Sequence, residues 1–281
     1  MLLQYQLISI CVLVEVGVTT GKIYSQYRTF VTDESEPLSD DQKFVIEKLK
    51  AEVGPKLPHS YIKEDEYLIK WLEARNFDVQ EAEKMLLADL RWRKSNNIDN
   101  LQVDNDFPDL LEDYPVQIDT FDKNGAPVIT AFVGDWDLRN VHLTGKAPRL
   151  LLFLDKMMDD AAKIVRKSQK EGKAVRGFHV LLNLEGFNTV QHGCHKCVLG
   201  IVRLLQSYEN HFPGLVDKIV IFNAPPTIEA IAPLIKKSIT SDLDRHIKVF
   251  GSNKAAWKQY LNQFIDEDQL PEDFGGSRRN D

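Results

Sequence analysis

The chain has few cysteines, a deficit of positive charge and no long apolar run. Three cysteines in 281 residues cannot build a disulfide framework. Lys and Arg number 35 against 42 Asp and Glu, a net charge of −7, so we expect no nucleic-acid partner, because such proteins need a basic surface. No apolar run reaches 18 residues, so we expect no membrane span. The hydrophobic content of 43% is typical of a globular protein.

Sequence motifs for nucleotide binding and nucleophilic catalysis are also missing. The chain has no Gly-x-Gly-x-x-Gly or Walker loop, with which a helix N-terminus usually holds phosphate. It has no Gly-x-Ser-x-Gly turn of the kind that carries a serine nucleophile. We therefore expect no cofactor and no enzymatic activity.

One short stretch resembles a metal site, from His192 to Cys197. Its four His and Cys side chains within six residues are zinc ligands by type. Only some of them can converge at the start of a helix, and no second Cys/His pair follows. We therefore expect no metal here, and interpret the stretch as exposed polar residues with one buried thiol. The alternatives are a structural zinc site and an enzyme that uses such a site.

Residues 1–38 leave the compartment open. Leu7 to Val18 is largely apolar and small residues follow it to Gly21, which outlines a signal peptide. Against this, Glu15 interrupts the apolar stretch and no Lys or Arg precedes it. The alternatives are an irregular extension and a gene-model artefact, so the protein is either cytoplasmic or secreted. Residues 25–37 are polar and acidic, which is typical of a linker.

Residues 39–98 predict three short helices that form a small subdomain. Ser39 with Gln42 and Asp78 with Glu81 are capping boxes, in which each side chain satisfies a free helix N–H. The apolar positions recur at helical spacing between short loops. The apolar residues of the first helix are Phe44, Ile46, Leu49 and Val53. The expected buried face of the second helix is Tyr67, Leu68, Trp71 and Leu72.

Residues 110–276 predict an α/β domain with a mixed, largely parallel sheet, because strands and helices alternate. Asn124-Gly125 marks a hairpin between the first two strands. The expected strands are 115–120, 128–133, 178–184, 218–222 and 246–250, and the expected helices are 149–170, 189–211 and 227–239.

The helix expected at 227–239 is unusual. Its apolar residues lie on one face, yet Pro233 interrupts it and Lys236-Lys237 end it. Such a helix can serve as a mobile lid, or it can be an ordinary crossover helix with a proline kink. The apolar face consists of Ile228, Ile231, Leu234 and Ile235.

Six stretches of the chain together carry a family resemblance. They are 65–79 (DEYLIKWLEARNFDV), 91–93 (RWR), 208–213 (YENHFP), 222–225 (FNAP), 249–251 (VFG) and 270–276 (LPEDFGG). In this order they resemble the CRAL-TRIO lipid-transfer proteins, of the phosphatidylinositol- and tocopherol-transfer type. The resemblance implies a helical N-terminal domain at 39–98 and a lipid-binding domain at 110–276, without an additional C-terminal β-sandwich. It also implies a sheet that forms the floor of an apolar cavity, with 227–239 as its gate.

Some headgroup-binding positions of this family depart from its pattern here. Arg75 matches the arginine that holds phosphate, although it can equally be a cation at a helix C-terminus. The family's glutamate is replaced by Gly214, and its lysine by His246. Four positions that carry hydroxyl groups in phospholipid-binding members are apolar: Ile118, Ile129, Phe178 and Val180.

These departures favour a weakly polar ligand, because a buried phosphate needs charge-assisted partners. We expect a monomeric carrier for a retinoid, tocopherol, sterol precursor or tail-held diacyl lipid, which docks transiently on membranes through Lys236 and Lys237. The alternative is a lipid-sensing regulatory module without net transfer. The expected lipid-binding residues are Arg75, Ile118, Ile129, Phe178, Val180, Ile228, Ile231, Leu234, Ile235 and His246.

Overall fold

A computed structural model describes residues 38–279 of the chain. The chain forms two compact units, with the boundary between Leu87 and Ala88. Cys11 and the stretch to which the signal-peptide hypothesis applies lie outside the described residues. Within them, no helix is long and apolar enough to cross a bilayer.

The first unit is helical. It holds α2 (Asp40–Val53), η1 (Gly54–Lys56), η2 (Ser60–Lys63), α3 (Asp65–Glu73) and the first half of α4 (Val79–Asn96). The capping box at Ser39 and Gln42 is confirmed. Ile46, Leu49 and Val53 are fully buried, whereas the side chain of Phe44 is 62% exposed. Phe44 precedes the buried Ile46 by two positions, which puts it on another helical face.

The second unit is built on a five-stranded sheet in the order β1-β2-β3-β4-β5. β1 and β2 form an antiparallel hairpin and the other neighbours are parallel, which confirms the mixed, largely parallel sheet. Gly125 supplies the positive φ of the hairpin turn, at 85°. The strands are β1 (Val116–Phe121), β2 (Pro127–Phe132), β3 (Phe178–Asn183), β4 (Val216–Phe222) and β5 (Ile247–Val249).

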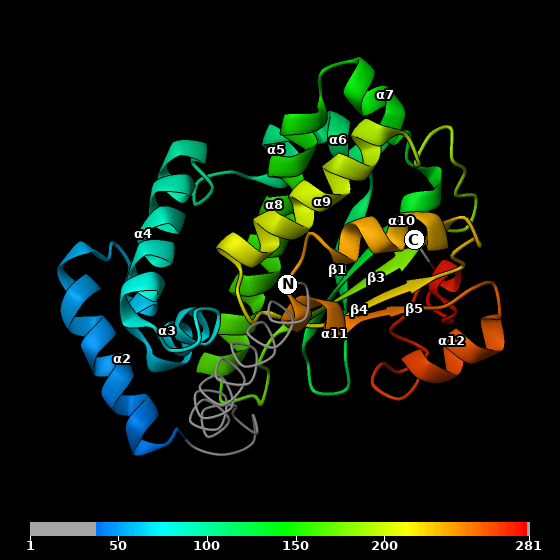
Figure 1. Cartoon of the computed structure of the whole chain (residues 1–281). Coiled ribbons are helices and arrows are strands. Elements are labelled where there is room, and N and C mark those ends of the chain that lie inside the picture. The colour runs from blue at the N-terminus through cyan, green and yellow to red at the C-terminus, as the bar shows by residue number, and fades with distance from the viewer. Residues whose placement is uncertain (1–37, 280–281) are drawn as a thin grey trace, which may run out of the picture. The chain divides into compact units, whose positions relative to one another are not determined.

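Helices cover both faces of this sheet (Figure 1). On one face α8 packs Phe153 and Met157 into a core with Phe178 of β3. On the other, α12 packs Trp257 against β4. The helical elements of the second unit after α4 are α5 (Val103–Asp106), α6 (Pro108–Asp113), η3 (Val133–Asp135), α7 (Leu138–Leu143), α8 (Ala147–Lys170), α9 (His195–His211), α10 (Ile228–Lys236), α11 (Ser241–His246), α12 (Lys254–Leu261) and η4 (Glu272–Phe274).

The structure corrects two expectations around α9. The helix begins at His195 instead of residue 189, because Asn188 and His192 form a hydrogen-bonded turn before it. Cys194 and Cys197 are joined in a disulfide, so the expectation of one buried free thiol in this stretch is wrong. Within residues 38–279, no group of three or more His, Cys, Asp or Glu side chains is arranged to hold a metal.

Candidate functional site

One face of the sheet carries two uninterrupted rows of apolar side chains. Alternate residues of a strand point to the same face, so the register between strands aligns them across the sheet. No polar side chain enters either row. The first row is Ile129, Val180, Ile219 and Ile247, and the second is Ala131, Leu182, Ile221 and Val249.

The protein covers these rows unevenly. Ile129 and Ala131 on β2 are buried, at 5% and 3% exposure, whereas Val249 on β5 is 49% exposed. Between them Ile219 is buried, at 7% exposure, whereas Val180, Leu182, Ile221 and Ile247 are half-buried. Central strands of a parallel sheet are normally buried on both faces. On the opposite face this rule holds, because Leu181, Val220 and Phe222 are fully buried. The row-bearing face therefore leaves apolar surface over β3, β4 and β5 on which an apolar molecule can pack.

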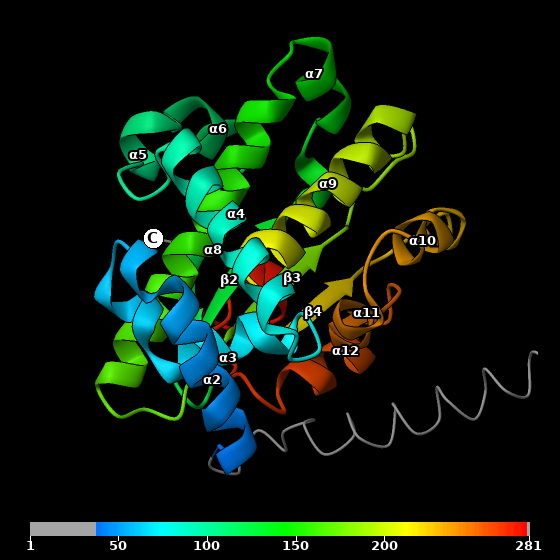
Figure 2. The same cartoon turned by 60° about the vertical axis from the view of Figure 1, so that its left-hand side comes forward.

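Helix α10 lies beyond the carboxyl ends of β3 and β4 and contacts α9 (Figures 1 and 2). Its apolar residues Ile228, Ile231 and Ile235 are only half-buried, and Leu234 is 56% exposed. Pro233 interrupts its hydrogen bonding. An apolar helix with so little buried surface has few packing contacts to hold it in place.

The segments on either side of α10 are held by side-chain hydrogen bonds. On the N-terminal side, Asn223 has a φ of 55° and donates from Nδ2 to Asn183 Oδ1 at 2.9 Å. On the C-terminal side, Glu209 of α9 accepts from the backbone N and the Oγ1 of Thr240, at 2.7 and 2.6 Å. Lys236, the last residue of α10, forms an ion pair with Asp244 at 3.2 Å.

The four apolar site residues expected on the sheet strands come together. Ile118, Ile129, Phe178 and Val180 belong to the same hydrophobic cluster on the row-bearing face. Phe178 is fully buried and Ile129 is 5% exposed, so the protein's own side chains cover them. Ile118 and Val180 are half-buried and keep exposed apolar surface. That these residues contact a ligand stays a prediction.

The expected polar site residues are more scattered. Arg75 follows α3 in the first unit, and its Nη1 donates to the carbonyl of Ala74 at 2.8 Å. His246 lies at the amino end of β5, where Nδ1 is 2.7 Å from the carbonyl oxygen of Asp217. Gly214 has a φ of 64°, a conformation that a glutamate adopts only with strain. The roles of Arg75 and His246 stay predictions.

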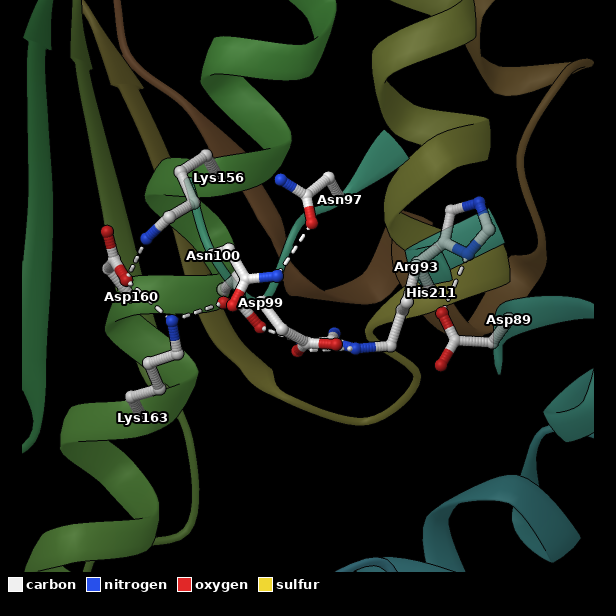
Figure 3. Close-up of polar contacts among 10 residues, drawn as sticks. Asp89, Arg93, Asn97, Asp99, Asn100, Lys156, Asp160, Lys163 and His211 are labelled. Carbon is white, nitrogen blue, oxygen red and sulfur yellow. Dashed lines mark hydrogen bonds and ion pairs between the residues drawn. The ribbon is translucent and has the colours of Figure 1, made fainter. Parts of the chain in front are cut away.

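The sequence reasoning missed a buried charge network in the second unit (Figure 3). Arg93 Nη2 lies 2.8 Å from Asp159 Oδ1 of α8 and also pairs with Asp99. Lys163 Nζ is 2.8 Å from the other oxygen of Asp159. Burial raises the pKa of Asp159, but Arg93 and Lys163 outweigh this and hold it below its ordinary value. This network ties α8 to residues 88–96 of α4.

A second buried acid on α8 is only partly compensated. Asp155 is 2% exposed, and burial raises its pKa to about 6, although a hydrogen bond with Ser207 opposes the shift. Asp155 and Asp159 are four residues apart and therefore share one helical face. Two acidic residues on the inward-facing side of the expected helix 149–170 were the sequence signal for this buried pair.

Comparisons with known proteins agree with this architecture. A CRAL-TRIO domain-containing protein of Caenorhabditis elegans is 24% identical over 260 residues, which is 92% of this chain and 35% of that protein. The protein named real-time of Drosophila melanogaster is 25% identical over 215 residues, covering 74% of this chain and 32% of its own length. The chain thus spans about a third of the length of the curated relatives it matches.

The crystal structure of Sfh5 superimposes with a TM-score of 0.67 at 16% identity, covering 88% of this chain and 90% of that one, which shows a shared fold. The family profile described as CRAL/TRIO domain matches residues 111–276, more than half of the sequence. The chain belongs to the CRAL/TRIO domain family, a family of lipid-binding and lipid-transfer proteins.

Proposed function

We propose that the second unit carries one hydrophobic molecule against its row-bearing sheet face, and that α10 opens to load and release it. One observation carries the proposal. On one face of the central strands β3 and β4, Leu181, Val220 and Phe222 are fully buried. On the other face Val180, Leu182 and Ile221 are only half-buried, and the two rows on that face are wholly apolar. A helix with few buried side chains lies at its edge.

The cargo we propose is weakly polar, such as a retinoid, tocopherol, sterol precursor or diacyl lipid held by its tails. Neither row offers a charged or hydroxyl side chain to a phosphate, and burying a phosphate without such partners is costly. Apolar burial contributes about 25 cal/mol per Å², so a ligand that covers roughly 300 Å² gains about 7 kcal/mol. Binding therefore needs no strong polar anchor.

Membrane docking supplies the opening step in this proposal. Leu234 is exposed on α10, and Lys236 and Lys237 follow it, so one end of the helix offers an apolar tip beside two cations. Lys236 already pairs with Asp244, which leaves Lys237 as the stronger candidate for a lipid headgroup. Insertion of Leu234 into a bilayer would draw α10 away from the sheet, because its own contacts with the protein are few.

The first experiment identifies the cargo. Protein purified from its own tissue is measured by native mass spectrometry, and the bound molecule is extracted into organic solvent and identified. An isoprenoid or similar apolar molecule is the expected result. A retained phosphatidylinositol would contradict the argument from polarity.

The second experiment tests the site and separates carrier from sensor. Leu182→Trp fills the half-covered face, and Gln117→Trp is the matched control at an exposed position of β1. We expect Leu182→Trp to lose both ligand binding and vesicle-to-vesicle transfer of a fluorescent apolar probe, while the control keeps both. Equal transfer by the two variants would refute the assigned face. Binding without transfer in the unchanged protein would favour a sensing module.

A further inference from the structure

The cysteine pair at the amino end of α9 has no part in carrying a lipid. Cys194 and Cys197 are bonded to each other across a single helical turn. We propose that this pair is a thiol–disulfide exchange site, reduced by low-molecular-weight thiols and reoxidised by their disulfides. The proposal is independent of the lipid-carrying function.

The bond is poorly placed to stabilise the fold. A disulfide stabilises chiefly by closing a loop in the unfolded chain, and the effect grows with the length of the loop. Here the bonded residues are three positions apart, so the closed ring is short and the bond joins no distant segments of the chain. The Cys-x-x-Cys spacing at a helix N-terminus is instead the arrangement in which thiols become reactive.

Both sulfur atoms have partners that suit the reduced pair. Cys194 is the N-cap of the 17-residue α9, and its Sγ accepts from the backbone N of Cys197 at 3.1 Å. A thiolate at this position is stabilised by that N–H and by the helix dipole. Cys197 Sγ lies 3.5 Å from the carbonyl oxygen of Gln191, which can accept from a neutral thiol. The site is therefore built to hold Cys194 as a thiolate and Cys197 as a thiol.

The preceding turn holds the pair in place without needing the disulfide. His192 is fully buried, its Nδ1 accepts from the backbone N of Asn188 at 3.1 Å, and its Nε2 lies 3.1 Å from the carbonyl oxygen of Val133. A side chain at Gly193 would meet the backbone of Thr189 at about 3.0 Å, so the turn is closely packed. Reduction should therefore change the chemistry of the two sulfurs while leaving α9 folded.

Unequal exposure decides which sulfur is attacked and which one leaves. Cys194 is half-buried, whereas Cys197 is 1% exposed. An incoming thiolate attacks Cys194 Sγ, the S–S bond breaks, and Cys197 leaves as a thiolate that takes a proton from water. A second thiol then attacks the mixed disulfide and frees Cys194. In sum, two small thiols and the protein disulfide give one small disulfide and the protein dithiol.

The test titrates the folded full-length protein in glutathione buffers of increasing oxidised fraction. Samples are quenched with acid, alkylated and digested with trypsin after denaturation. Trypsin cuts after Lys196, between the two cysteines, so the oxidised pair appears as peptide 177–196 linked to peptide 197–203. Cys11 falls on a separate peptide, 1–22. We expect the linked form to dominate in oxidised glutathione and two alkylated peptides to dominate in reduced glutathione.

Two variants test the assignment of roles. In Cys197→Ser, Cys194 should form a mixed disulfide with glutathione, whereas in Cys194→Ser the buried Cys197 should react at least tenfold more slowly. Circular dichroism checks that both variants are folded. The proposal is overturned if the pair yields only to reductant in denaturant, if no linked peptide forms under oxidised glutathione, or if the two cysteines react at equal rates.

Discussion

Replacing Asp155 by asparagine should stabilise the protein at neutral pH. Burial raises the pKa of this carboxyl from 3.8 to about 6, the hydrogen bond with Ser207 notwithstanding, and Oδ1 finds no hydrogen-bond partner among residues 38–279. Between about pH 4 and 6 the folded state binds a proton that the unfolded state does not. Protonation of Asp155 therefore stabilises the folded state of the unchanged protein. This contribution is full below about pH 4 and is lost as pH rises through about 6. Two pKa units correspond to about 3 kcal/mol.

The assay is urea denaturation of the unchanged protein and of Asp155→Asn at several pH values from 4 to 7.5. The difference between them isolates Asp155 from the carboxyls whose pKa is lowered, such as Asp122 and Asp159. We expect Asp155→Asn to gain up to about 3 kcal/mol at pH 7.5 and a gain near zero at pH 4. The exposed Asp104→Asn serves as control and should change little. A difference that is constant across this pH range would refute the reasoning.

Two further changes test packing. Arg93→Met should cost about 3–5 kcal/mol in urea denaturation, because it strips the buried Asp159 of one of its two cations; a loss below about 1 kcal/mol would count against the network. Gly134→Ala should destabilise by about 3 kcal/mol or more, because the new Cβ would lie 1.6 Å from the carbonyl oxygen of Glu185. Gly54→Ala meets nothing within 4 Å and should instead raise the melting temperature slightly, and the same thermal scan compares the two glycines.

The periodic elements of the fold could be predicted because their signals are local. The hairpin at Asn124-Gly125, the cap at Ser39 and the apolar strands all follow from neighbours in the sequence. The start of α9 was missed by six residues because its turn depends on His192, whose imidazole reaches back to Val133. A contact across 59 positions leaves no periodic trace in the chain.

The candidate site was predictable in its lining and not in its coverage. Alternation along β2 and β3 places Ile129 and Val180 on one face, and the register confirms that they are neighbours. How much of each side chain stays exposed depends on α9 and α10, which are packed by tertiary contacts. The charge network was missed for a related reason, because Asp159 finds Arg93 66 positions away.

The contrast between the two faces of β3 and β4 is the strongest reason to regard the half-covered one as functional. The same two strands carry Leu181 and Val220, both fully buried under the C-terminal segment, so the sequence is able to cover this sheet completely. Leaving Val180, Leu182 and Ile221 half-covered forgoes about 25 cal/mol for every Å² of apolar surface that stays exposed. A molecule that binds there adds RT ln(1 + [L]/Kd) to the stability of the folded protein, so the surface that weakens the fold also drives the uptake of cargo.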